Sequence, residues 1–158
     1  MIMYALATEN DLDNLVAFLE DPSIDGTFVK PLSDRPITIR ERVYKKFKDG
    51  YWILAKEGEN LLGCLALIPN KDEIEISTYA VSEKARGKGI GTGLIYESEK
   101  VTLERYPSVQ TLILDSWSGN PAIERIMDKT GFGLRDSFPD PDKRPPGINT
   151  VVYAKKVR

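Results

Sequence analysis

A glycine-rich segment, AVSEKARGKGIGTGLIYE, occupies residues 80–97. It contains four glycines and two cations at close spacing: Arg86, Gly87, Lys88, Gly89, Gly91 and Gly93. The residues that follow, LIYESEKVTLERY, look like the body of a helix, so the glycines lie at its start. Each glycine costs a helix interior about 1 kcal/mol relative to alanine, and a cation at the N-terminus opposes the helix dipole. An anion bound at this end would make the arrangement favourable, so the segment predicts an anion site.

A glycine-rich turn between a strand and a helix exposes backbone N–H groups, and the helix dipole behind them favours phosphates. Spacing excludes two well-known forms of such a site. The dinucleotide-binding pattern G-x-G-x-x-G would need a third glycine at Thr92 or Leu94, and the P-loop pattern G-x-x-x-x-G-K-[ST] is absent. A flexible loop without a ligand is the alternative, but it gives no reason for the cations Arg86 and Lys88.

The chain has 158 residues, no histidine and one cysteine, Cys64. This composition excludes a Ser-His-Asp triad, a Cys-His pair and a histidine-ligated metal, and we expect no metal. Proton transfer must therefore use Asp, Glu, Tyr, Lys, Cys or water. Cys64 lies in the apolar stretch GCLAL, where a buried thiol is a better interpretation than an acyl-enzyme nucleophile.

Length and composition set limits on the class of protein. Hydrophobic residues make up 41% of the chain, charged residues 29%, and the net charge is −2. These values predict one folded domain over residues 1–158, with neither nucleic acid nor a membrane as partner. The N-terminus does not resemble a signal peptide, no apolar stretch would span a bilayer, and one cysteine excludes an internal disulfide. We expect a cytoplasmic monomer or homodimer.

Hydrophobic periodicity predicts the elements that position these residues. Strands are expected at 3–8, 51–57, 61–69, 73–82, 109–117, 132–138 and 150–157. Helices are expected after a capping box of Thr8 and Asp11, and at about 37–49, 89–105 and 121–129. The order β-α-α-β-β-β-α-β-α-β-β predicts an α/β (α+β) fold, a mixed and mostly antiparallel sheet with helices on both faces. The charges of the second helix could form a binding patch, but a solvated face is the better interpretation: Arg40, Glu41, Arg42, Lys45, Lys46 and Lys48.

The spacing R-x-x-G-x-G, made by Arg86, Gly89 and Gly91 directly after the strand YAVS, resembles the pyrophosphate-binding motif of the GCN5-related N-acetyltransferase family. The resemblance covers nearly the whole chain, and NPAIERIMDKTGF (120–132) is similar to the family's second conserved stretch. It implies transfer of an acetyl group from acetyl-CoA to a primary amine of a small molecule or peptide, by direct attack in a ternary complex. A sensor that binds acyl-CoA without turnover is the alternative.

The resemblance also implies which residues hold acetyl-CoA. Backbone N–H groups from Lys88 to Thr92 would bind the pyrophosphate, and the preceding strand end would pair with the pantetheine arm. Asn120 would contact that arm or begin the next helix. The expected cofactor-binding residues are Tyr79, Ala80, Val81, Arg86, Gly87, Lys88, Gly89, Ile90, Gly91, Thr92 and Asn120. A side chain at Gly89 or Gly91 is expected to occupy the place of the phosphate.

The resemblance to the family is less complete at the residues that transfer protons. Many members carry a tyrosine seven residues after the asparagine, which protonates the leaving thiolate, but this chain has Met127 there. Core packing is the better interpretation of that methionine. Glu75, six residues before Val81, matches the general-base glutamate of the histone-acetylating branch, although a solvent-facing carboxylate stays an open alternative. Glu73 is the substitute base, and Tyr79 is a further catalytic candidate near the acyl group.

Strand alternation gives these candidates a common face. It predicts that the following side chains point the same way: Glu73, Glu75, Ser77, Tyr79 and Val81. The loops 21–36 and 139–149, both of mixed charge, are expected to choose the acceptor amine. Trp117 either lines the acceptor pocket or only packs beside it.

Overall fold

The structure, a computed structural model, describes residues 1–24 and 38–158. Most of the expected loop at 21–36 therefore lies outside the described residues. The described strands are β1 (Ile2–Leu6), β2 (Tyr51–Glu57), β3 (Asn60–Asn70), β4 (Glu73–Val81), β5 (Thr111–Trp117), β6 (Gly133–Pro139) and β7 (Asn149–Lys156). The described α-helices are α1 (Leu12–Glu20), α2 (Ile39–Asp49), α3 (Ile90–Arg105) and α4 (Pro121–Thr130). The predicted element order is confirmed, with ends that differ by a few residues.

The strands form one mixed sheet in the order β1-β2-β3-β4-β5-β7-β6. Only β4 and β5 run parallel, and every other neighbouring pair is antiparallel. A parallel pair needs a long crossover connection, which α3 supplies between β4 and β5. Among the described residues, no helix is long and apolar enough to cross a membrane.

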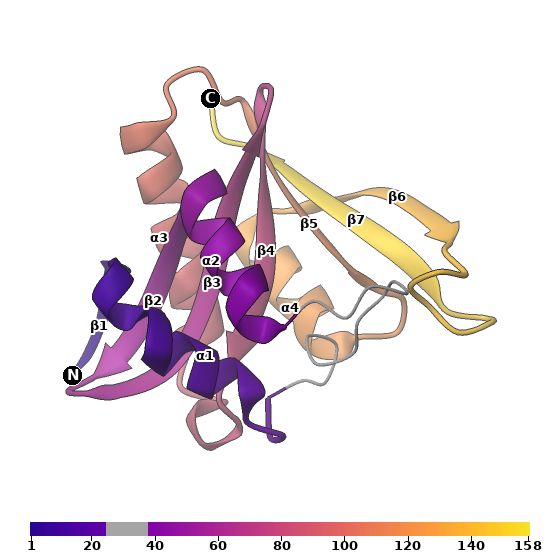
Figure 1. Ribbon diagram of the computed structural model, residues 1–158. Coiled ribbons are helices and arrows are strands. Elements are labelled where there is room, and N and C mark those ends of the chain that lie inside the picture. The colour runs from indigo at the N-terminus through magenta and orange to yellow at the C-terminus, as the bar shows by residue number, and fades with distance from the viewer. Residues whose placement is uncertain (25–37) are drawn as a thin grey trace.

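Helices cover both faces of the sheet, as Figure 1 shows with α1 and α2 in front of it and α3 and α4 behind it. Leu15 and Val43 of the front helices share one core with Trp52 and Cys64 of the sheet. The rear helices share a second core with the other sheet face, which includes Ile74, Ile76, Leu112 and Leu114. The predicted mixed sheet with helices on both faces is confirmed.

The predicted alternation along β4 is wrong beyond Ser77. Cys64 lies opposite Ala80, but Ala66 lies opposite Ser77, so β4 carries one extra residue in this interval. Thr78 has a φ of 50°, in the left-handed region that residues other than glycine rarely adopt. This β-bulge shifts the phase of the strand by one residue.

The bulge redirects the side chains that follow it. Before the bulge, Ile74 and Ile76 face the rear core. After it, Tyr79 and Val81 pack against that same core, whereas Ala80 belongs to the front core. Tyr79 and Val81 therefore do not share a face with Glu75, contrary to the sequence-based expectation.

The sheet opens next to the bulge. The parallel pairing of β4 with β5 ends at Ile76 and Leu114, although β4 continues to Val81 and β5 to Trp117. The two strands diverge beyond that point, which is visible in Figure 1. Backbone groups and side chains at the diverging ends thus become accessible to a ligand from both faces of the sheet.

Candidate active site

A cavity of about 720 Å³ lies where the end of β4 meets the N-terminal ends of α3 and α4, and we call it the α3 cavity. Most of the expected cofactor-binding residues border it: Tyr79, Ala80, Val81, Arg86, Gly87, Gly89, Ile90, Gly91, Thr92 and Asn120. Lys88 is not among the described residues that line it. Residues separated by forty positions in the sequence therefore meet around one hollow.

The N-terminus of α3 has the features of an anion site. Gly89 precedes the helix with a φ of 77°, and Gly87 has a φ of 80°. A Cβ built on either glycine would meet no atom of the described residues within 4 Å, so these residues leave the space beside the backbone open. The first N–H groups of a helix lack partners within it, and the first turn of α3 contains no acidic residue. This end of the helix can accept a phosphate group.

The other two glycines serve a different purpose. A Cβ on Gly91 would lie 2.5 Å from the hydroxyl of Tyr79, and a Cβ on Gly93 would collide with the hydroxyl of Tyr4. These glycines let α3 approach two tyrosine side chains. The expectation that a side chain on Gly91 would occupy the place of a phosphate is therefore wrong, because it would first meet Tyr79.

Tyr79 lies at the opening of the sheet, with an unusual hydroxyl group. The oxygen is buried and has no hydrogen-bond partner among the described residues. Burial raises the pKa of Tyr79, so the phenol stays protonated at neutral pH. An unpartnered buried hydroxyl costs about 1–3 kcal/mol. A ligand that accepts a hydrogen bond at the opening would remove this cost.

A second cavity of about 390 Å³ lies on the other side of the opening, and we call it the α2 cavity. It is bordered by α2, by β4 and β5, and by Lys143 and Arg144 of the loop before β7. Tyr79, Trp117, Asn120 and Ile123 line both cavities, which therefore meet between β4 and β5. Trp117 thus lines the pocket and does not only pack beside it.

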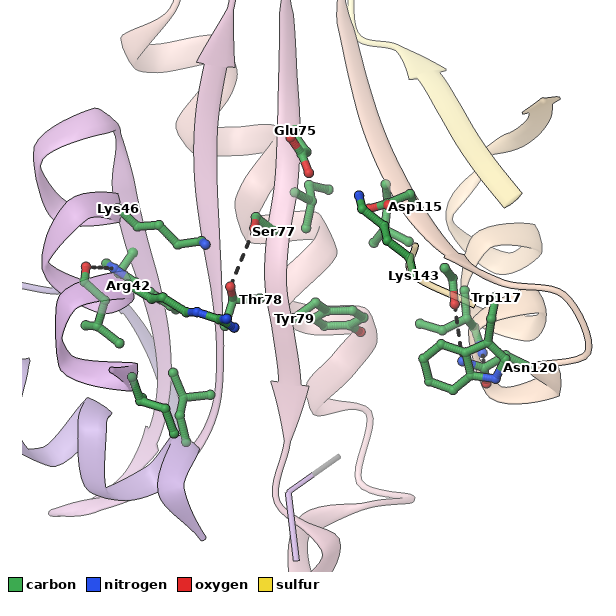
Figure 2. A pocket seen from close by; sticks show the side chains of 18 of the residues that line it. Arg42, Lys46, Glu75, Ser77, Thr78, Tyr79, Asp115, Trp117, Asn120 and Lys143 are labelled. Atoms are coloured by element: carbon green, nitrogen blue, oxygen red, sulfur yellow. Dashed lines mark hydrogen bonds between the residues drawn. The ribbon is translucent and has the colours of Figure 1, made fainter. Parts of the chain in front are cut away.

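Glu75 points into the α2 cavity from β4, as Figure 2 shows. Burial raises the pKa of its carboxyl group, and the charge of Asp115 raises it further. Lys143 and Lys46 oppose this shift in the pKa. An enclosed carboxyl group with a raised pKa is suited to accept a proton near neutral pH. Glu73, the expected substitute, forms an ion pair with Arg135.

Charged residues that were not expected site residues also line the α2 cavity. Arg42 and Lys46 come from α2 and Asp115 from β5. The prediction of a wholly solvated face on α2 is therefore wrong at two positions, although Lys45 and Lys48 are exposed. The i, i+4 spacing of Arg42 and Lys46 was an available signal, because such residues share a helix face.

Three other expectations are confirmed. Cys64 is fully buried, burial raises the pKa of its thiol, and its Sγ lies 3.8 Å from the carbonyl oxygen of Thr78. It has the environment of a structural thiol. Met127 is 1% exposed and belongs to the core behind the sheet. Asn120 caps α4 by accepting a hydrogen bond from the N–H of Ile123, 3.4 Å away.

The site thus combines a mixed sheet that opens between two parallel strands with a glycine-rich helix N-terminus at the opening. The sequence profile of the acetyltransferase (GNAT) family matches residues 15–132. The chain therefore belongs to the GNAT acetyltransferase family. No curated protein sequence matches this chain.

Solved structures share its fold at low sequence identity. A ribosomal-protein-S18-alanine N-acetyltransferase from Escherichia coli is 16% identical, and the match spans 99% of this chain and 94% of that protein with a TM-score of 0.75. An N-acetyltransferase from Staphylococcus aureus Mu50 is 21% identical, covers 100% and 99%, with a TM-score of 0.77. The structure of yncA from Salmonella typhimurium, with its cofactor acetyl-CoA, is 13% identical, covers 100% and 95%, with a TM-score of 0.77.

Proposed function

We propose that this protein transfers the acetyl group of acetyl-CoA to a primary amine of a small molecule or peptide, by direct attack in a ternary complex. One observation carries the proposal: two cavities meet between β4 and β5, and they share Tyr79 and Trp117. The α3 cavity offers an anion site, and the α2 cavity offers an enclosed carboxyl group. A donor and an acceptor entering from opposite faces would meet at the opening.

The α3 cavity fits coenzyme A by its chemistry. The N–H groups at the start of α3, with the open space beside Gly87 and Gly89, would hold the pyrophosphate, and Arg86 would add positive charge. The diverging end of β4, from Tyr79 to Val81, would pair its backbone with the pantetheine arm. Bound acetyl-CoA supplies an acetyl group activated as a thioester.

Glu75 is proposed as the general base. An amine is mostly protonated at pH 7 and cannot attack before it loses a proton. The Glu75 carboxylate lines the α2 cavity, where it would accept that proton. The amine nitrogen would then form a bond to the acetyl carbon while the carbon–sulfur bond breaks, and the electron pair of that bond stays on sulfur. The second proton of the nitrogen would pass to this thiolate, which gives the amide and the free thiol.

Tyr79 is proposed as the hydrogen-bond donor to the leaving sulfur. The helix position where the family often has its tyrosine is occupied by Met127, which lies in the core. The hydroxyl of Tyr79 is protonated, buried and without a partner among the described residues, and it borders both cavities. The hydroxyl of Tyr79 on β4 would thus replace the tyrosine hydroxyl that many members of the family carry on the helix corresponding to α4.

Direct transfer is favoured over an acyl-enzyme. Cys64 is the only cysteine of the chain, and its thiol is fully buried with a raised pKa. A buried thiol that stays protonated is a poor nucleophile. The amine therefore has to attack the thioester itself.

The test is release of free thiol from acetyl-CoA in the presence of amines, amino acids, polyamines and peptide N-termini, one class at a time. We expect one class to accelerate thiol release, and Glu75→Gln to slow it without weakening coenzyme A binding. Tight binding of coenzyme A with no transfer to any member of the panel would favour the sensor instead. Absence of coenzyme A binding by calorimetry would overturn both.

A further inference from the structure

We infer that the acceptor is a small zwitterion, an amine that carries a carboxylate or similar acidic group a few bonds away, and that Lys46 binds this acidic group. The inference rests on the proposed function and names the substrate class of the same site. It follows from the side chains that line the α2 cavity, because positive and negative charges both border this small space.

The charges come from three separate parts of the fold. Lys46 extends from α2, Glu75 and Asp115 come from the adjacent strands β4 and β5, and Lys143 comes from the loop before β7 (Figure 2). The two carboxyl groups are close enough for Asp115 to raise the pKa of Glu75. No ion pair within 4 Å joins any of these four side chains to another described residue. They surround the cavity and do not neutralise one another by contact.

Lys46 is the side chain that most needs a partner. Burial is the first cause of its lowered pKa, and the neighbouring cations Arg42 and Lys45 lower the pKa further. The charges of Glu75 and Asp49 oppose that change, but neither forms an ion pair with Lys46. An ammonium group that is largely withdrawn from water is unfavourable unless an acidic group pairs with it. An acidic group on the acceptor would provide the counter-ion inside the cavity.

The two ends of such an acceptor match the two sides of the cavity. Its ammonium group would lie beside Glu75 and Asp115, near the opening where the thioester is expected. Its acidic group would lie on the α2 side of the cavity, where the ammonium group of Lys46 extends from α2 toward the sheet (Figure 2). A cavity of about 390 Å³ is at the lower end of the range for small-molecule sites, about 300–1,000 Å³. These features favour a compact zwitterion over a polyamine, which has no acidic group for Lys46.

The experiment compares matched acceptors. Each of the L-α-amino acids is tested as the free acid and as its C-terminal primary amide, and kcat/KM is measured from thiol release. We expect the best free acid to exceed its amide by about tenfold or more, because a hydrogen bond to a charged group is worth at least that factor. Lys46→Met should lower this acid-to-amide ratio by about tenfold or more.

The ratio separates recognition from catalysis. Loss of the Lys46 charge also alters the pKa of Glu75, but that change affects an acid and its amide alike and cancels in the ratio. The matched control is Lys45→Met, which removes an exposed lysine on the same helix that pairs with Asp49 at 2.7 Å. This control should keep the wild-type preference for the acid.

A binding measurement keeps the inference independent of turnover. Calorimetry with the protein–coenzyme A complex compares an N-acetyl-amino acid with its primary amide, and the acid should bind more tightly in wild type but not in Lys46→Met. Equal use and equal binding of acids and amides by the wild-type protein would overturn the inference and leave acetyl transfer intact. Preferential binding of the acid without any transfer would support the inference and refute the proposed function.

Discussion

The anion site at the start of α3 gives the sharpest test, through the substitution Gly89→Val. Gly89 has a φ of 77°, and no atom in the described part of the chain lies within 4 Å of a Cβ built on it. The new side chain would therefore extend into the open space beside the backbone N–H groups. That is the space in which we place the pyrophosphate of coenzyme A.

Two effects are expected, and their sizes can be worked out separately. A residue other than glycine in the left-handed region costs about 1–2 kcal/mol, which in a chain of this size lowers Tm by about 2–8 °C. Loss of two hydrogen bonds from N–H groups to charged phosphate oxygens, at about 1.5 kcal/mol or more each, weakens binding by about 100-fold or more. The first effect concerns folding, and the second concerns the ligand.

Gly58 offers a matched control. It lies in the β2–β3 turn with a φ of 60°, and a Cβ on it would also meet none of the described atoms within 4 Å. It is not among the described residues that line the α3 cavity. Gly58→Val should lower Tm by a similar amount and leave coenzyme A affinity unchanged.

The assay is calorimetric titration with coenzyme A and, separately, with pantetheine, which lacks the pyrophosphate. Gly89→Val should lose affinity for coenzyme A and leave the much weaker binding of pantetheine as it is in wild type. If folded Gly89→Val binds coenzyme A as the wild type does, or if Gly58→Val loses as much affinity, the pyrophosphate does not bind at the start of α3.

Three further substitutions test the roles of Glu75 and Tyr79 and the placement of Met127. Glu75→Gln should lower turnover about 10²–10⁴-fold at pH 7. In the wild type the rate should fall as pH drops through the raised pKa of Glu75, above the ordinary value of 4.5, and the variant should lose this fall. An unchanged pH–rate profile would exclude Glu75 as the base. The raised pKa means that the folded state holds the proton of Glu75 more tightly than the unfolded state does. The free energy of unfolding should therefore fall as pH rises from 4.5 through the raised pKa. Since glutamine carries no such charge, Glu75→Gln should raise Tm at pH 7. Tyr79→Phe removes a buried hydroxyl without a described partner and should raise Tm while it lowers kcat; wild-type kcat would contradict its role. Met127→Tyr should lower Tm and spare coenzyme A affinity, since the added hydroxyl enters the core, and a stable, faster variant would refute that placement.

The sequence by itself determined the features that depend on neighbouring residues. The order of strands and helices follows from hydrophobic periodicity, and nearly every element lies within a few residues of its expected bounds. The glycine run marks a turn with positive φ before a helix, which only glycine adopts readily. Asn120 and Pro121 begin α4 for equally local reasons, a side-chain cap and a fixed φ. Such signals need no knowledge of the rest of the chain.

The tertiary structure decided which side chains meet at the opening. The bulge at Thr78 depends on the register of β4 against β3, and a shift of one residue moved Tyr79 to the other face of the sheet. The same holds for Gly91, whose purpose is set by the approach of Tyr79 from another element.

The burial of Lys46 likewise depends on where α2 packs relative to β4 and β5. On the helix alone, Lys46 and Lys45 are adjacent lysines with the same intrinsic chemistry. Their environments differ because one side of α2 faces a cavity and the other faces solvent. Contacts between segments far apart in the chain create that difference, and a local sequence pattern does not encode them.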